Sequence, residues 1–186
     1  MHVLKFCPSC GEDTLQQHCL KSLQCAICQC TLYLNTAAGV GAIITCGEDI
    51  LLAVRGQEPC AGKLDIPGGF VDYGETAEQA LARELKEELD LDVDIGLEMA
   101  SPTYFCSFPN TYPYRGIVYQ TLDFFFLIHL YQKPVVRAGD DVAAYVWMRR
   151  ADLSLEEMAF ASGRQALFEY GRMTDAVGAN QVPLEA

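Results

Sequence analysis

The stretch from Gly69 to Leu91, GFVDYGETAEQALARELKEELDL, constrains the fold of this chain more than any other segment. Thr76, with Gln79 three residues later, is a capping-box pattern that predicts the start of a helix. Apolar residues then recur at every fourth position, as expected for a helix that packs one stripe on a core. Three carboxylates stand at i, i+3 and i+4, so the helix presents them together on one face: Glu84, Glu87 and Glu88.

Such a cluster of like charges favours a bound cation. Each like-charge pair at i, i+4 destabilises a helix by roughly 0.2–0.5 kcal/mol. The preceding Pro67-Gly68-Gly69 predicts a turn with unusual backbone angles, and a carbonyl there can complete an oxygen shell. Oxygen ligands suit Mg²⁺ or Mn²⁺. The alternative is a solvated acidic face crossed by salt bridges, in which Arg83 pairs with Glu87 or with Glu75.

The same residues resemble the signature of a known family, the Nudix hydrolases. Its box reads Gly, five residues, Glu, seven residues, then Arg-Glu-apolar-x-Glu-Glu-x-Gly-apolar. The one departure is Asp90, where the family usually has the glycine that ends a helix in a left-handed conformation. Because Asp tolerates that conformation better than most residues, we expect a small stability cost and unchanged chemistry. The chain matches the box at Gly69, Glu75, Arg83, Glu84, Leu85, Glu87, Glu88 and Leu91.

The resemblance implies an α/β fold, the Nudix α/β/α sandwich around a mixed sheet, over residues 39–173. It also implies Mg²⁺-dependent hydrolysis of the diphosphate bond in a nucleoside diphosphate linked to another moiety. Glu75 and Arg83 would orient the site rather than react. The implied metal ligands are the carboxylates of Glu84, Glu87 and Glu88, which are also the catalytic candidates, and the backbone carbonyl of Gly69.

A further acid is expected beyond the box. Many members of the family carry a base or an extra ligand on a loop before the last strand, and Asp140 and Asp141 occupy that place here. We take Asp141 as the catalytic candidate of this pair. Two acids beside a glycine are also typical of an ordinary solvated turn.

Nine cysteines include two Cys-x-x-Cys pairs near the start of the chain. The two pairs are separated by 14 residues, and two such turns place four thiolates tetrahedrally, as Zn²⁺ prefers. We predict a small ribbon over residues 1–38 around a structural Zn²⁺. Two disulfides and a redox dithiol are less favoured by the context, and an iron site stays open on ligand type. The ligands are Cys7, Cys10, Cys25 and Cys28, with Cys30, Cys19 and His18 close enough to replace one of them.

Charge is distributed unevenly along the chain. The net charge is −12, yet two lysines and two acids cancel within residues 1–38, so the excess lies in the remainder. A ribbon that binds nucleic acid would be basic, which favours a structural or dimer-forming ribbon. We expect a homodimer that acts on a small nucleotide and binds no nucleic acid. With no apolar run long enough to span a bilayer and no signal-peptide pattern, we expect a cytoplasmic protein.

The segment after the box bears on the substrate. A zinc ribbon followed by a Nudix box resembles the NADH pyrophosphatases, which carry Ser-Gln-Pro-Trp-Pro-Phe-Pro soon after the box. Residues 101–110 share only the Phe-Pro fragment with that signature. NAD(H), ADP-ribose, FAD and similar dinucleotides therefore stay open as substrates. A catalytically idle nucleotide sensor is the alternative class, and the intact Arg-Glu-x-x-Glu-Glu set favours the enzyme.

We interpret residues 101–116 as a proline-rich loop that follows the box. Tyr112 and Tyr114 can stack on a base there, and Arg115 can bind phosphate or ribose. The alternative is an ordinary loop whose tyrosines cover the core. Arg55, at the end of a strand, is another candidate phosphate contact.

The remaining elements follow from periodicity and turn residues. A hairpin is expected from residues 40–46 and 50–55, which Gly47-Glu48-Asp49 joins. A long β-branched and aromatic run at 118–131 predicts a central strand. We also expect a short strand at 145–148, helices at 155–158 and 164–173, and a weakly specified tail at 174–186.

Overall fold

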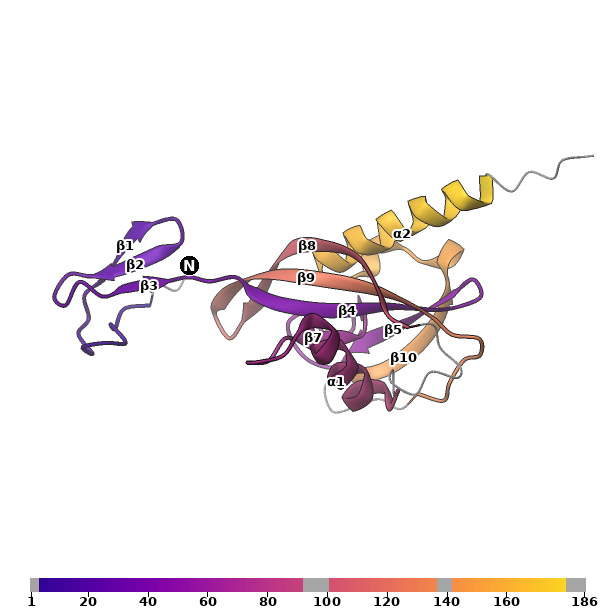
Figure 1. Cartoon of the computed structure of the whole chain (residues 1–186), viewed down its shortest axis with the longest axis horizontal. Coiled ribbons are helices and arrows are strands. Elements are labelled where there is room, and N and C mark those ends of the chain that lie inside the picture. The colour runs from indigo at the N-terminus through magenta and orange to yellow at the C-terminus, as the bar shows by residue number, and fades with distance from the viewer. Residues whose placement is uncertain (1–3, 92–100, 137–141, 180–186) are drawn as a thin grey trace, which may run out of the picture.

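The computed structural model describes residues 4–91, 101–136 and 142–179, which form two sheets and two helices (Figure 1). The small sheet contains β1 (Leu15–Cys19), β2 (Ser22–Cys25) and β3 (Thr31–Tyr33). The large sheet contains β4 (Ala37–Cys46), β5 (Asp49–Arg55), β6 (Leu64–Asp65), β7 (Gly68–Phe70), β8 (Thr103–Tyr114), β9 (Ile117–His129) and β10 (Val142–Arg149). The helices are α1 (Ala77–Leu89) and α2 (Ala161–Ala179), with the 3-10 turns η1 (Arg150–Asp152) and η2 (Leu155–Glu157).

The large sheet is mixed, as expected for an α/β/α sandwich. Its strands follow the order β10-β5-β4-β9-β8, while β6 pairs with β5 and β7 pairs with β4. Only β4 and β9 run parallel among these pairs of described strands. The run at 118–131 is therefore an interior strand, β9, between β4 and β8. This confirms the prediction for that segment.

Alternate residues of β4 point to opposite faces of the sheet, and each face is covered by one helix. Val40, Ala42 and Ile44 pack in one apolar cluster with α1. Ile43 belongs to a second cluster with α2. This period of two is that of a strand buried on both faces. The α/β/α sandwich is confirmed.

Helix α1 has the predicted beginning and end. Both bonds of the capping box are formed between Thr76 and Gln79. The three leucines of its apolar stripe are buried in the cluster with β4, and Ala77 at its start is partly buried. Asp90 ends the helix in the left-handed region at φ 54°, and its N–H points to carbonyls of the last turn. Asp therefore fills the position at which the family usually has Gly, as we expected.

Three stretches differ from the expectations. Residues 103–114 form the long strand β8 rather than a loop. Pro109 and Pro113 are accommodated because β8 lies at the edge of the sheet and pairs only with β9. Residues 155–157 form a single 3-10 turn. Helix α2 starts at Ala161 and continues to Ala179, so it includes the first part of the predicted tail.

The small sheet lies to one side of the large one and has its own core (Figure 1). Leu15 and Leu23 are its buried apolar residues besides cysteines. The chain passes from β3 to β4 through residues 34–36. Within the described part of the chain, no helix combines the length and the apolar character that crossing a membrane requires.

Candidate active site

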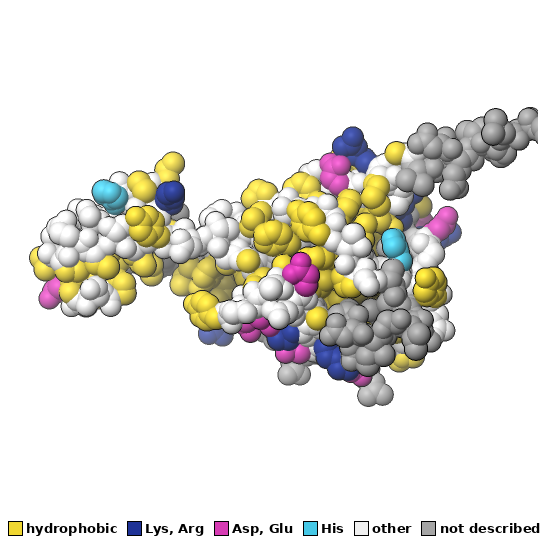
Figure 2. All heavy atoms as spheres, viewed as in Figure 1, with side chains coloured by type: hydrophobic (Ala, Val, Ile, Leu, Met, Phe, Trp, Pro, Cys, Tyr) yellow, Lys and Arg dark blue, Asp and Glu magenta, His cyan; other side chains and the backbone are white. Residues whose placement is uncertain are grey.

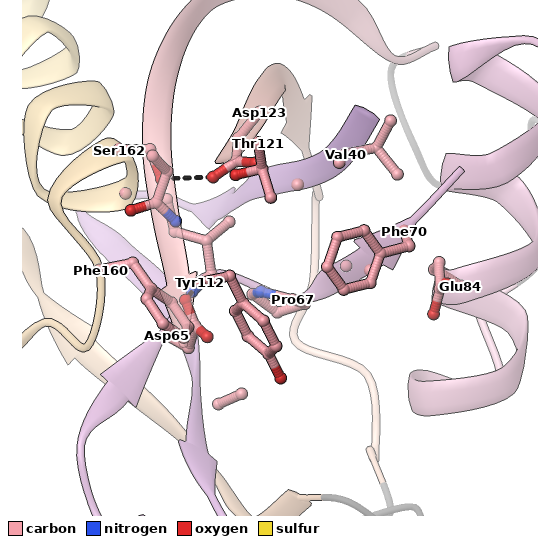
Figure 3. A pocket seen from close by; sticks show the side chains of 18 of the residues that line it. Val40, Asp65, Pro67, Phe70, Glu84, Tyr112, Thr121, Asp123, Phe160 and Ser162 are labelled. Atoms are coloured by element: carbon pink, nitrogen blue, oxygen red, sulfur yellow. Dashed lines mark hydrogen bonds between the residues drawn. The ribbon is translucent and has the colours of Figure 1, made fainter. Parts of the chain in front are cut away.

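A cavity of about 490 Å³ opens where β4, β5, β7, β8, β9 and the two helices meet (Figure 3). Glu84 and Glu88 of α1 line it together with the backbone of Gly68 and Gly69. Asp65, Tyr112, Thr121, Asp123, Phe160 and Ser162 also line it. The Nudix-box helix and residues remote from it in sequence thus share one cavity.

Arg83 holds the carboxylates of the box in place. Its Nε and Nη2 donate to the two oxygens of Glu75 at 2.8 and 3.0 Å, a bidentate pair. Its Nη1 donates to Glu84 at 2.8 Å and to Glu87 at 3.3 Å. Nη2 also donates to the carbonyl of Phe70 at 3.0 Å, which ties α1 to β7. The hydrogen bonds from Arg83 hold the pKa of Glu75 below its usual range.

Glycine is required beside Glu84. A Cβ on Gly69 would lie 2.4 Å from Glu84 Oε1, so any other residue would displace that carboxylate. The N–H of Gly68 donates to Glu88 Oε2 at 3.1 Å. Burial raises the pKa of Glu84, against the opposing effect of Arg83. The Gly68-Gly69 backbone therefore positions both carboxylates at the cavity wall.

The cavity extends over both faces of the sheet. Val40 of β4 pairs with Gly69 of β7, on the face that α1 covers. Gly39 pairs with Phe70 of β7 and with Asp123 of β9, and paired residues point to one face. That face is the one α2 covers. Glu84 and Glu88 thus lie on what we call the α1 side of the cavity, and Phe70 and Asp123 on its α2 side.

An ion pair borders the α2 side. Arg55 Nη1 donates to Asp65 Oδ2 at 2.9 Å, and Arg55 Nε donates to the carbonyl of Pro59 at 2.7 Å. The guanidinium carbon lies 4.8 Å from the ring centroid of Phe160. Burial raises the pKa of Asp65 to about 6, although Arg55 opposes the shift. Arg55 is therefore engaged by protein groups at the cavity wall.

The predicted residues are distributed unevenly around this cavity. Tyr112 and Tyr114 line it from β8, and Arg55 lines it from β5. Glu87 does not line it; its side chain is 60% exposed and bonds to Arg83. Arg115 lies in the turn between β8 and β9, with its guanidinium carbon 5.3 Å from the Tyr114 ring centroid, and is not a lining residue. Asp140 and Asp141 lie outside the described residues.

Several polar residues of the cavity were not anticipated, among them Asp65, Thr121, Asp123 and Ser162. The charge of Asp123 within the apolar run LDFFF is the signal that points to one of them. A carboxylate in an interior strand is expected only where a partner or a ligand takes its charge. Nothing comparable in the sequence marks Ser162, which is brought to Asp123 by the packing of α2.

The four predicted cysteines form a second candidate site, in the small sheet. Their sulfur atoms lie within 4.8 Å of one another: Cys7, Cys10, Cys25 and Cys28. Thr14 Oγ1, at 3.1 Å, and the backbone N–H of Cys28 lower the pKa of Cys25 to about 6. Cys19 instead contacts Ser22 Oγ at 3.0 Å. A set of four thiols at this spacing, one of them readily ionised, fits Zn²⁺.

The carboxylate set fits a different metal. Glu84 and Glu88 offer carboxylate oxygens in one open cavity, which are donors that Mg²⁺ and Mn²⁺ take. The space at Gly69, which a Cβ would fill, is occupied by the Glu84 carboxylate. The residues present are therefore suited to a hard divalent cation.

The fold and the box define the class of protein. A family profile for the NUDIX domain matches residues 35–169, and the chain belongs to the NUDIX family. A curated relative is the NAD-capped RNA hydrolase NudC of Pseudomonas entomophila, 34% identical over 89 residues, or 48% of this chain and 32% of that protein. Another is the ADP-ribose pyrophosphatase of Methanocaldococcus jannaschii, 48% identical over 60 residues, or 32% of this chain and 36% of that protein. The matched part spans about a third of each relative.

Solved structures agree on the architecture. A NUDIX hydrolase from Nitrosomonas europaea superposes with a TM-score of 0.65 at 24% identity, covering 90% of both chains. A MutT NUDIX hydrolase from Burkholderia pseudomallei gives 0.60 at 27% identity, covering 72% of this chain and 97% of that one. The first likeness, which extends over most of both chains, concerns the fold alone.

Proposed function

We propose that this protein hydrolyses the diphosphate bond of a nucleoside diphosphate linked to another moiety, with Mg²⁺ or Mn²⁺ as the cofactor. NAD(H), ADP-ribose, FAD and similar dinucleotides are the candidate substrates. The observation that carries the proposal is the cavity into which Glu84 and Glu88 project beside the backbone of Gly68 and Gly69. The names of the relatives, which refer to a NAD cap and to ADP-ribose, support the same substrate class.

The box residues would have two roles, metal binding and positioning of the metal ligands. Glu84 and Glu88 would hold the cation, with Glu87 as a further ligand and the Gly69 carbonyl completing the shell. A bound divalent cation supplies charge neutralisation on the diphosphate oxygens during attack by water. Arg83 fixes the rotamer of Glu84 through its 2.8 Å bond and is itself fixed by Glu75. Arg83 and Glu75 are therefore positioning residues, because their side chains already form hydrogen bonds with protein groups.

The remaining parts of the site would serve the substrate. One of the box glutamates or Asp141 would accept the proton of the attacking water. Tyr112 and Tyr114, which line the cavity from β8, would contact the nucleoside. Cys7, Cys10, Cys25 and Cys28 would hold a structural Zn²⁺ remote from this chemistry. We keep a homodimer without a nucleic-acid partner as the expected assembly.

The proposal is tested by hydrolysis of a panel of dinucleotides with Mg²⁺. Glu88→Gln should lower kcat by about three orders of magnitude, because the neutral amide is a poor ligand for a hard cation. The matched control is Glu157→Gln in η2, which lies outside the cavity and should leave kcat unchanged. Circular dichroism should show that both variants are folded.

One outcome would overturn the enzyme proposal, and a second would overturn the role of Glu88. If the wild-type chain hydrolyses none of the dinucleotides but binds one of them tightly, the nucleotide-sensor alternative is correct. If Glu88→Gln retains near-normal turnover, Glu88 has no place in the metal site.

A further inference from the structure

The α2 side of the cavity has a polar floor that the metal chemistry does not use. Asp123 lies on the face of the sheet opposite to that of Glu84, as the pairing of Gly39 and Val40 shows. A Cβ on Gly39 would lie 2.8 Å from Asp123 Oδ1, so glycine leaves the room that this carboxylate occupies. Ser162 Oγ donates to Asp123 Oδ2 at 2.6 Å. The carboxylate is therefore held in one orientation by β4 and α2.

A second polar group on this floor has no partner. Thr121 is 3% exposed, and its Oγ1 makes no hydrogen bond to any residue that the structure describes. Thr121 stands two residues before Asp123 on β9, so both side chains point to the same face, and Figure 3 shows them side by side. A buried hydroxyl without a hydrogen-bond partner destabilises the fold unless a ligand binds it. The floor therefore presents one fixed carboxylate and one unsatisfied hydroxyl.

Aromatic rings form the walls above this floor. The Tyr112 ring lies between Phe70, at a centroid distance of 5.5 Å, and Phe160, at 5.4 Å (Figure 3). The Arg55 guanidinium lies over the Phe160 ring. Flat apolar walls around a small polar floor suit a planar heterocycle better than a sugar, whose hydroxyls would face the rings.

We propose that Asp123 recognises the exocyclic amino group of a purine base, and that this contact sets the base specificity of the cavity. An ionised carboxylate only accepts hydrogen bonds, so it selects a ring that presents N–H groups at that point. A base without the amine forgoes this hydrogen bond and leaves the half-buried carboxylate with the bond from Ser162, which weakens its binding. The inference rests on the proposed function for the presence of a nucleotide in the cavity.

The other floor residues complete the recognition. The Thr121 hydroxyl donates to a ring nitrogen next to the amine, or accepts from a ring N–H if the base presents one. Ser162 acts through Asp123 as a positioning residue, since its hydrogen bond fixes the carboxylate. Adenine carries its exocyclic amine on C6 and guanine on C2, and the experiment distinguishes them.

The test compares mononucleotides that differ only by an amine, with affinity measured by isothermal titration calorimetry. AMP is compared with purine riboside 5′-monophosphate, and GMP with IMP. In one of the two pairs we expect the amine to tighten binding about ten- to hundredfold, the range for a hydrogen bond to a charged group. The pair that responds identifies the base. Because no bond is cleaved, the result does not depend on turnover.

Variants then assign the effect to Asp123. Asp123→Ala should reduce the amine ratio to within about twofold, and Asp123→Asn, which keeps the shape and one acceptor oxygen, should give an intermediate ratio. Asp152→Ala, at an exposed aspartate outside the cavity, is the matched control and should keep the wild-type ratio. Ser162→Ala should lower the ratio several-fold, and Ser162→Thr should restore it.

The outcomes separate this inference from the proposed function. Equal affinity within both pairs overturns it, as does failure of all four mononucleotides to bind. A uniform loss of affinity in Asp123→Asn, with the ratio unchanged, shows that the residue only supports α2 and also overturns it. In the first and last of these cases, hydrolysis of a dinucleotide by the wild-type protein would still support the proposed function.

Discussion

The ribbon and the Nudix domain differ in what stabilises each of them internally. The buried core of the ribbon consists of Cys7, Cys25 and two leucines. The large sheet instead has an extensive apolar cluster on each face, with α1 over one and α2 over the other. A core as small as that of the ribbon contributes little against the entropy of ordering the chain, so we expect a bound metal to contribute the rest. We expect the Nudix domain, with its larger core, to fold without a metal.

Charge separates the two regions as well. The ribbon is neutral, and Figure 2 shows few charged side chains on it, whereas the rest of the chain carries the whole net charge of −12. Part of that charge belongs to the cavity, where Glu84, Glu88, Asp65 and Asp123 gather. Carboxylates in a cavity destabilise a fold unless they are paired or hold a ligand. By our proposal, the metal is structural in one region and catalytic in the other.

Removing zinc should produce the largest difference between the two regions. Because structural zinc contributes about 10–16 kcal/mol to small domains, a chelator should unfold residues 4–33 entirely and leave the Nudix domain folded. Hydrogen exchange resolved along the chain, together with the zinc content, measures this. Cys25→Ser should reproduce the loss, and Cys106→Ser, in β8, should retain the zinc. Full protection of the ribbon in metal-free protein would show that its own core suffices.

Deleting apolar groups sharpens the same contrast. Leu81→Ala, at a fully buried position of α1, should lower the free energy of unfolding of the Nudix domain by about 2–5 kcal/mol. Leu23→Ala, in the ribbon core, should leave that transition unchanged and weaken zinc retention instead. Urea denaturation followed by tryptophan fluorescence reports on the Nudix domain alone, because Trp147 in β10 is the single tryptophan. A shift of this transition in Leu23→Ala would mean that the two regions fold together.

The pH dependence of stability should show the smallest effect. The pKa of Asp65 is about 6 in the folded chain and near its ordinary 3.8 in the unfolded chain. Between these values the folded state binds a proton that the unfolded state does not, so this contribution is full below pH 4 and lost as the pH rises through 6. The two pKa values correspond to about 3 kcal/mol. Asp65→Asn lacks this contribution.

Urea denaturation of both chains from pH 4 to 8 measures the difference. The stability of the wild type relative to Asp65→Asn should fall over that range by up to about 3 kcal/mol. A constant difference would show that Asp65 titrates alike in the folded and unfolded chains.

Much of the fold was predictable where local signals agree. The capping box at Thr76, the buried stripe of α1 and the end at Asp90 could all be predicted, because each depends on residues close together in one segment. Strand β9 could be predicted from its β-branched and aromatic run. Strand β8 could not, because Pro109 and Pro113 are typical of a loop and become acceptable only at a sheet edge.

The sequence by itself determined which side chains we propose as reactive or metal-binding: the carboxylates of the box, Arg83 that orders them, and the two cysteine pairs. Their spacing lies within one helix or one pair of turns, so local geometry suffices. Only the tertiary structure decided the α2 side of the cavity. Asp123 and Ser162 are 39 residues apart and meet because α2 packs on the face of β9 that bears Asp123. A contact made by packing two elements leaves no periodic trace in the sequence, so the half of the site that we propose to recognise a base appears only in the folded chain.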